Sequence, residues 1–348
     1  MRESLQGFWS EAWDVFELAD RGSADAQVME IRIAGSRVSI RFASAALRQA
    51  IGRAFEHLQI PLSVDRPDLT IGVWDSMSSR LPVPTPPWPL SCLTGRGDIV
   101  GWHSASIRAC FQPSCRMLSM MHVSDGRAMI WINDAEAIPR QVRCVPLLAT
   151  VHWISGHLGM HVVHVGAVGH ETGAALLAGD GGAGKSCTAI ACACDGMSYV
   201  GDDYCILDPG PMPRAHSAFS TGKLYAQDVE RLAIPAEWGG ALDIETGEKT
   251  ILFLNDCIPQ RMAADLPLKL ILLPRVGNWR STSCEPAPKT EAMRALLGAT
   301  LANLPEAGRP AVERVASIVR RLPCRYLNLG AGGRPVADVV REQIQDCQ

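Results

Sequence analysis

A glycine-rich segment near the middle of the chain has the residue types and spacing of a phosphate-binding loop. It matches the pattern Gly-x4-Gly-Lys-Ser/Thr in full, with Gly179, Asp180, Gly181, Gly182, Ala183, Gly184, Lys185 and Ser186 in succession. Glycines let backbone N–H groups approach phosphate oxygens without a Cβ in the way. We expect Lys185 to bridge the β- and γ-phosphates of a nucleotide and the Ser186 hydroxyl to hold Mg²⁺.

The flanks of this segment agree with that interpretation. Ala174–Ala178 reads as a buried strand, and the small and apolar residues from Cys187 to Ala193 read as a helix. The N-terminus of a helix favours an anion, so Cys187 joins the expected nucleotide contacts. The alternative is a strand–helix turn with an exposed lysine, but the chain has only five lysines and a chance match is rare.

Two adjacent carboxylates follow the next strand-like run. Met197–Gly201 ends in Asp202 and Asp203, where a second contact to Mg²⁺ is expected. Successive side chains on an extended or turning backbone point in different directions, so one aspartate can face a metal while the other faces an incoming hydroxyl. That division suits phosphoryl transfer to an alcohol. The alternative is an Asp-Asp turn in solvent.

Other charged residues are weaker candidates. His152, His157, His161 and His164 lie close in sequence, but the segment passes from helix to strand, so their rings are expected to diverge and not to form a metal site. Extra cations could assist the transition state, and the candidates, of which the two lysines rank first, are Arg214, Lys223, Arg231 and Lys249. Solvated surface charge is the alternative for each of the four.

The second half alternates strands and helices, which predicts an α/β layer arrangement. Strands are expected within 162–168, 174–178, 199–207, 251–254 and 268–273. Helices are expected within 186–193, 291–304, 312–322 and 336–344.

The first half predicts a separate, smaller α+β domain. Period-two alternation over 31–42 indicates a hairpin, Ser44 can cap a helix that ends before Pro61, and 69–75 alternates as a strand. Five prolines between 76 and 90 exclude a helix or central strand there. Beyond them, we expect a strand at 129–132 and a helix at 144–159. The predicted division is residues 1–78 for the N-terminal domain, 79–95 for a proline-rich linker and 96–348 for the catalytic domain.

Composition excludes several classes of protein. With a formal net charge of -3 and 47% hydrophobic residues, the chain should fold around a core, and neither nucleic acid nor a membrane is an expected partner. No apolar run of about 18 residues occurs and the N-terminus lacks a signal core, so we expect a cytoplasmic protein with reduced cysteines.

These motifs together resemble the HPr kinase/phosphorylase family, P-loop kinases that phosphorylate a protein or peptide serine. Its members carry a histidine-containing strand, similar here to Val163–Val168, then the phosphate loop, then a strand that ends in Asp-Asp. The resemblance implies a P-loop catalytic domain that uses ATP and Mg²⁺. It also implies that Asp202 is the base toward the acceptor hydroxyl and that Asp203 binds Mg²⁺ with Ser186. His164 would lie beside the transferring phosphate.

One departure narrows the resemblance. The bifunctional enzymes carry a signature of the type Glu-Val-Arg-Gly-Leu-Gly after the aspartate pair. This signature is missing here, where residues 214–220 are Arg-Ala-His-Ser-Ala-Phe-Ser. Short relatives without it include kinases of lasso-peptide biosynthesis, which modify a serine at the end of a precursor peptide. The expected function is therefore an ATP-dependent serine kinase acting on such a peptide, within a chain that could form a homo-oligomer as HPr kinases do. An HPr-type protein kinase and a nucleotide-hydrolysing switch without an acceptor are the alternatives.

Overall fold

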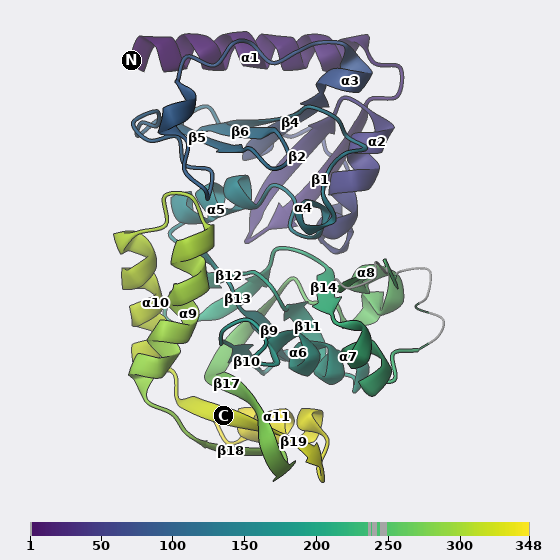
Figure 1. Ribbon diagram of the computed structural model, residues 1–348, viewed down its shortest axis with the longest axis vertical. Coiled ribbons are helices and arrows are strands. Elements are labelled where there is room, and N and C mark those ends of the chain that lie inside the picture. Colours follow the sequence, from purple (N-terminus) through teal and green to yellow (C-terminus); the bar gives the residue numbers. More distant parts are fainter. Residues whose placement is uncertain (1, 236–237, 239–241, 244–248, 348) are drawn as a thin grey trace. The chain divides into compact units, whose positions relative to one another are not determined.

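The computed structural model describes residues 2–235, 238, 242–243 and 249–347, which form a mixed α/β protein with several sheets (Figure 1). Two compact units make up the chain. Unit 1 comprises Met1–His157 together with the short segment Asn303–Glu306, and unit 2 comprises Leu158–Ala302 and Ala307–Gln348. No helix among the described residues is both long and apolar enough to cross a membrane.

Unit 1 is built on a seven-stranded sheet in the order β3-β1-β2-β4-β7-β6-β5. Its strands are β1 (Gln27–Ile33), β2 (Ser36–Phe42), β3 (Gln59–Ile60), β4 (Leu69–Asp75), β5 (Ile107–Gln112), β6 (Met117–His122) and β7 (Arg127–Ile132). Its helices are α1 (Arg2–Gly22), α2 (Ala45–Leu47), α3 (Ser76–Ser79), α4 (Arg140–Cys144) and α5 (Leu148–His157), with a π turn at Arg48–Gly52 and 3₁₀ turns at Arg53–Leu58 and Leu90–Cys92.

Alternation along the central strand β4 gives the sheet its two covered faces. Trp74 faces the apolar stripe of α1, and Gly72 leaves room there because a Cβ would lie 2.4 Å from the ring of Phe16. Ile71 faces the other way, toward Phe55 and toward Val151 of α5. The hairpin, the Ser44 cap and the 69–75 strand agree with the sequence analysis, although the expected helix after Ser44 is a succession of α, π and 3₁₀ turns.

The division into units differs from the predicted one. β7 pairs in parallel with β4, from Thr70↔Arg127 to Asp75↔Ile132, so residues beyond 95 complete the sheet that the first 75 residues begin. Helix α3 at Ser76–Ser79 lies inside the stretch 76–90, so the expectation of no helix was wrong there; the prolines begin only at 82, and the Asp75 side chain caps the helix. The rest of the proline-rich segment, Arg80–Pro89, has no helix or strand, and its Trp88 packs in one core cluster with residues of α1. It is therefore part of unit 1 and not a linker between units. Local periodicity cannot show a pairing between strands about 55 residues apart.

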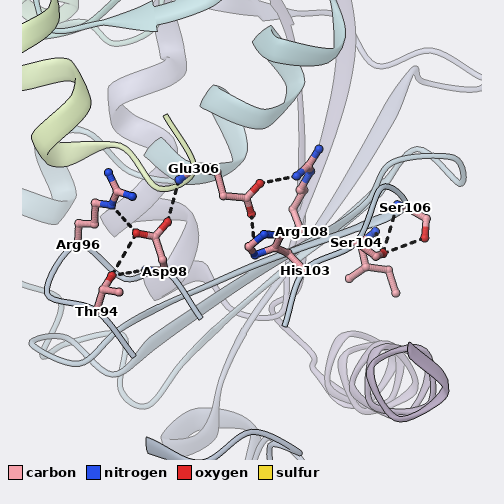
Figure 2. Close-up of polar contacts among 9 residues, drawn as sticks. Thr94, Arg96, Asp98, His103, Ser104, Ser106, Arg108 and Glu306 are labelled. Atoms are coloured by element: carbon pink, nitrogen blue, oxygen red, sulfur yellow. Dashed lines mark hydrogen bonds and ion pairs between the residues drawn. The ribbon is translucent and has the colours of Figure 1, made fainter. Parts of the chain in front are cut away.

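The segment Asn303–Glu306 belongs to unit 1 through a polar network (Figure 2). Asp98 Oδ1 accepts a hydrogen bond from the backbone N–H of Glu306 at 2.8 Å, while Oδ2 accepts one from the Thr94 hydroxyl at 3.1 Å and one from Arg96. The carboxylate of Glu306 pairs with Arg108, and His103 Nδ1 lies 3.7 Å from it.

Unit 2 contains a nine-stranded sheet, with the order β11-β9-β10-β17-β13-β12-β8 and with β19 and β18 continuing from β17. Its strands are β8 (His161–Val163), β9 (Gly166–His170), β10 (Gly173–Leu177), β11 (Ser198–Gly201), β12 (Cys205–Asp208), β13 (Arg214–Ser217), β17 (Asp265–Ser281), β18 (Ser283–Pro286) and β19 (Cys324–Gly332). A small sheet holds β14 (Thr221–Leu224), β16 (Thr250–Phe253) and β15 (Leu242–Asp243).

Helices cover both faces of the large sheet. The helices of unit 2 are α6 (Lys185–Cys194), α7 (Ala226–Arg231), α8 (Leu254–Cys257), α9 (Lys289–Asn303), α10 (Arg309–Arg321) and α11 (Val336–Gln345), with a 3₁₀ turn at Pro259–Arg261. Leu176 of β10 faces the core of α9 and α10, whereas Ala175 and Leu177 face the core of α6 and α11. β10, β17 and β19 run parallel, so the loop after β10 lies at the edge where parallel strands end.

Candidate active site

The glycine-rich loop connects the buried strand β10 directly to α6. Gly182 has φ +81° and Gly184 has φ +98°, a region that residues with a Cβ rarely adopt. A Cβ at Gly184 would also lie 2.5 Å from Leu329 Cδ1. In contrast, a Cβ at Gly181 or Gly182 would meet nothing within 4 Å, so these positions border open space.

Lys185, the first residue of α6, folds back across the loop. Its Nζ donates hydrogen bonds to the carbonyl oxygens of Gly179 at 2.7 Å and Asp180 at 3.2 Å, and the residue is only 6% exposed. Burial lowers the pKa of the ammonium, and the carboxylates of Asp203 and Asp202 oppose that shift. The result is a cation held at the loop by two neutral carbonyl groups, which an anion could replace.

Asp202 is a buried carboxyl with one oxygen free. It follows β11, is 2% exposed, and accepts a long hydrogen bond (3.4 Å) from the backbone N–H of Lys223 through Oδ2. Oδ1 has no hydrogen-bond partner among the described residues. Burial and the charge of Asp203 raise the pKa of Asp202 to about 6, while the nearby Ser186 hydroxyl acts in the opposite direction.

Asp203 is engaged at both oxygens. His164 Nε2 lies 3.0 Å from Oδ1, and Lys223 Nζ lies 2.7 Å from Oδ2. Burial raises the pKa of this carboxyl, but the hydrogen bond from His164 and the charge of Lys223 outweigh it, so the pKa lies well below its usual range. Asp203 is therefore a charged group fixed by two partners.

The histidine is itself held in place. Its backbone N–H donates to Thr300 Oγ1 at 3.1 Å, and its ring packs edge-on against Tyr204 at a centroid distance of 5.2 Å. Thr300 lies on α9 and donates in turn to the carbonyl of Leu296 at 2.7 Å. Nothing in the sequence indicated that Thr300 contacts His164, because the two residues are 136 positions apart.

One cavity of about 500 Å³, the main cavity, brings most of the predicted residues together. Its lining includes His164, Asp180, Gly181, Gly182, Ala183, Gly184, Lys185, Ser186, Cys187, Asp202, Asp203, Lys223, Arg231 and Lys249. Gly179 lies outside the lining and contributes its carbonyl to Lys185. Arg214 is also outside it and pairs with Asp265.

Four residues of the lining were not predicted. Tyr225, Gln227 and Asp228 come from the start of α7 and the residue before it, and Val276 comes from β17. Lys249 Nζ lies 5.0 Å from the Tyr225 ring centroid, a cation–π contact. Only the neighbouring Lys223 could have indicated Tyr225, and nothing in the sequence places Val276 beside the loop.

The residues of the main cavity suit a polyanion with a divalent cation. Lys185, Lys223, Arg231 and Lys249 supply positive charge around the loop. Among the described residues, no group of three or more His, Cys, Asp or Glu is placed to hold a metal by itself. Asp202 has an unpartnered Oδ1, and the Ser186 hydroxyl interacts with the same carboxyl. The two side chains fit Mg²⁺, which commonly takes one or two protein oxygens and completes its shell with phosphate and water.

Comparison with known proteins adds little to this geometry. No protein-family model matches the chain, and no curated protein matches it. Among solved structures, it is similar to the Hpr(Ser) kinase/phosphatase from Coxiella burnetii, with 12% sequence identity and a TM-score of 0.28. The match covers 53% of this chain and 95% of that chain. At these values the likeness is distant.

Proposed function

We propose that the protein is an ATP-dependent kinase that transfers the γ-phosphate to a serine hydroxyl of a peptide or protein. The observation that carries the proposal is that the glycine-rich loop, Lys185 and the two aspartates line one cavity. Phosphoryl transfer depends mainly on positioning and on neutralising charge, and these residues supply both.

The loop residues would bind the triphosphate. Lys185 would exchange its contacts with the carbonyls of Gly179 and Asp180 for contacts with the β- and γ-phosphates. Bound Mg²⁺ would neutralise charge on the phosphate oxygens. Lys223, Arg231 and Lys249 add positive charge in the same cavity.

For the aspartates we propose the reverse of the division expected from the sequence. Asp202 has a free oxygen and its carboxyl interacts with the Ser186 hydroxyl, so Asp202 and Ser186 are the better pair to hold Mg²⁺. Both oxygens of Asp203 already have partners in His164 and Lys223. Asp203, held by these two residues, would orient the acceptor hydroxyl.

This assignment can be tested by titrating Mg²⁺ with two variants. Asp202→Asn should raise the Mg²⁺ concentration needed for half-maximal transfer about tenfold or more, whereas Asp203→Asn should lower kcat with little change in that concentration. The opposite pattern would restore the division expected from the sequence. Asp208→Asn, outside the main cavity, is the matched control and should behave as wild type.

The acceptor that we propose is a lasso-type precursor peptide with a C-terminal serine. Its support is the sequence resemblance to short relatives of the HPr kinases, and an HPr-type protein remains the competing acceptor. Incubation with γ-labelled ATP, Mg²⁺ and serine peptides, with and without a C-terminal serine, should yield a product heavier by one phosphate. Release of phosphate at the same rate with and without every acceptor would favour a nucleotide-hydrolysing switch instead.

A further inference from the structure

A smaller cavity adjoins the main cavity at the first turn of α6. It has a volume of about 260 Å³, and we call it the α6 cavity. Cys187 and Arg231 line both cavities, so the two meet beside the helix N-terminus. The far wall of the α6 cavity is the end of β19 and the residues that follow it, 329–336.

We infer that the α6 cavity binds the nucleoside of the nucleotide whose phosphates occupy the main cavity, an inference that rests on the proposed function. The γ-phosphate must lie near Lys185, Asp202 and Asp203, where transfer would take place. A triphosphate that follows the loop then brings its α-phosphate to the N–H groups at the start of α6, near Cys187. The nucleoside leaves the main cavity at that point, where the α6 cavity begins.

The position of the α6 cavity in the sheet agrees with this direction. Ligands of open α/β sheets bind outside the carboxyl ends of parallel strands, and β19 ends here in parallel with β17. Leu232 and Leu329 offer apolar contact, and Thr282 offers a hydroxyl. Gly330 presents no side chain because a Cβ there would lie 2.2 Å from the carbonyl carbon of Ser281.

A third cavity, of about 400 Å³, is the rival site. It lies at the other edge of the loop and shares Asp180–Ala183 and Val276 with the main cavity. Its lining includes the carboxylates of Asp180 and Glu291, and Arg294 pairs with both. The described lining of the α6 cavity contains no carboxylate, and its two arginines pair with carboxylates outside that lining, Arg231 with Asp228 and Arg334 with Glu342. This lining therefore adds no negative charge next to the α-phosphate.

The test fills the α6 cavity and compares two ligands. Ala331 is exposed in its wall, so Ala331→Trp should obstruct the nucleoside and spare the loop. We expect calorimetry to show that Kd for Mg²⁺–ATP rises about tenfold or more, while Kd for Mg²⁺ with inorganic triphosphate stays within about twofold of wild type. If circular dichroism shows that this variant is unfolded, Gly332→Trp replaces it, since a Cβ there meets only the Arg280 carbonyl oxygen, at 3.5 Å.

Two matched tryptophans complete the set. Met212→Trp, at a residue that is 69% exposed and outside these cavities, should change neither Kd. Glu291→Trp fills the third cavity instead and should leave ATP binding close to wild type. Loss of ATP affinity in Glu291→Trp but not in Ala331→Trp would overturn the inference. An equal loss of affinity for ATP and for inorganic triphosphate in Ala331→Trp would also overturn it.

The two proposals fail in different ways. Unchanged ATP affinity in Ala331→Trp, with triphosphate still bound by the wild type, would overturn the nucleoside site and leave the kinase proposal standing. Wild-type protein that binds neither ATP nor triphosphate would overturn the proposed function and this inference with it.

Discussion

At the scale of single residues, adjacent side chains of the same type have different surroundings. Asp202 keeps a free oxygen in a buried position, while Asp203 is fixed by His164 and Lys223. The sequence predicted that two neighbouring aspartates would point in different directions. It could not predict which of them would meet the histidine, because that depends on how β9 and β11 are brought together in the sheet.

Thr300 should matter for stability through its hydroxyl. In Thr300→Val the backbone N–H of His164 loses its acceptor, which costs about 1–3 kcal/mol for a buried group. Thr300→Ser keeps the hydroxyl and loses only a buried methyl group, which costs about 1 kcal/mol. Urea unfolding of both variants measures these losses, and a Thr300→Val variant as stable as wild type would show that the hydrogen bond contributes nothing.

His161 should make the fold sensitive to mild acid. Burial, assisted by the charge of Arg314, lowers the pKa of His161 to about 4 from an ordinary 6.5. Between these values the unfolded chain binds a proton that the folded chain does not, so stability present above pH 6.5 is lost as the pH falls toward 4. The loss approaches about 3 kcal/mol, since each unit is worth about 1.4 kcal/mol.

The check is chemical denaturation of wild type and His161→Gln at several pH values from 4 to 7.5. The variant should show a shallower decline with acid, because it lacks this titrating group. Parallel curves would mean that other groups cause the acid sensitivity.

At the scale of elements, the loop between β10 and α6 combines two kinds of glycine. Gly184 is required by its positive φ and by the side chain of Leu329, whereas Gly181 borders open space and has neither constraint. The motif specifies glycine at position 184, whereas position 181 is one of its four variable residues. The structure separates a glycine that the backbone requires from one that borders open space.

Alanine substitutions should therefore have different effects at the two positions. Gly184→Ala should destabilise the protein by about 1–3 kcal/mol, because a strained backbone and a close contact coincide. Gly181→Ala should leave the free energy of unfolding within about 0.5 kcal/mol of wild type but weaken Mg²⁺–ATP binding. Thermal unfolding and calorimetry measure the two quantities, and similar losses of stability would contradict the distinction.

Element prediction succeeded where periodicity is local and failed where pairing is distant. The strand at 69–75 and the helix after Lys185 agree with the structure because alternation and a flanking motif mark them. α1 was not among the expected helices, although its buried stripe from Leu5 to Ala19 has helical spacing. β19 was missed because its glycine-rich end has no strand pattern. Its pairing partner β17 is distant in sequence, so local periodicity could not indicate the strand.

At the scale of the whole molecule, each unit has its own sheet, yet unit 1 is not continuous in sequence. Residues 303–306 belong to it through Asp98, Arg108 and His103. No pattern in the sequence indicates this, since the contacts join positions about 200 residues apart.

The buried carboxylate of Asp98 should be an important anchor of unit 1. Asp98→Asn disturbs its contacts with Thr94, Arg96 and the N–H of Glu306, so we expect a loss of about 1–3 kcal/mol. Asp125→Asn affects a half-exposed ion pair with Arg127 and a contact with His122, and it should cost less than about 1 kcal/mol. Seven of the nine tryptophans lie before residue 158, so intrinsic fluorescence during urea unfolding reports mainly on this unit, and equal effects of the two variants would contradict the anchor role.

Unit 1 is made of two separate segments of the chain, and this affects how the protein could be shortened in evolution. A gene that lost everything before codon 158 would still encode the four residues 303–306, and Glu306, at φ +58°, would have none of its hydrogen-bonding neighbours. A viable short descendant would need a remodelled turn between α9 and α10, for example with glycine in place of Glu306.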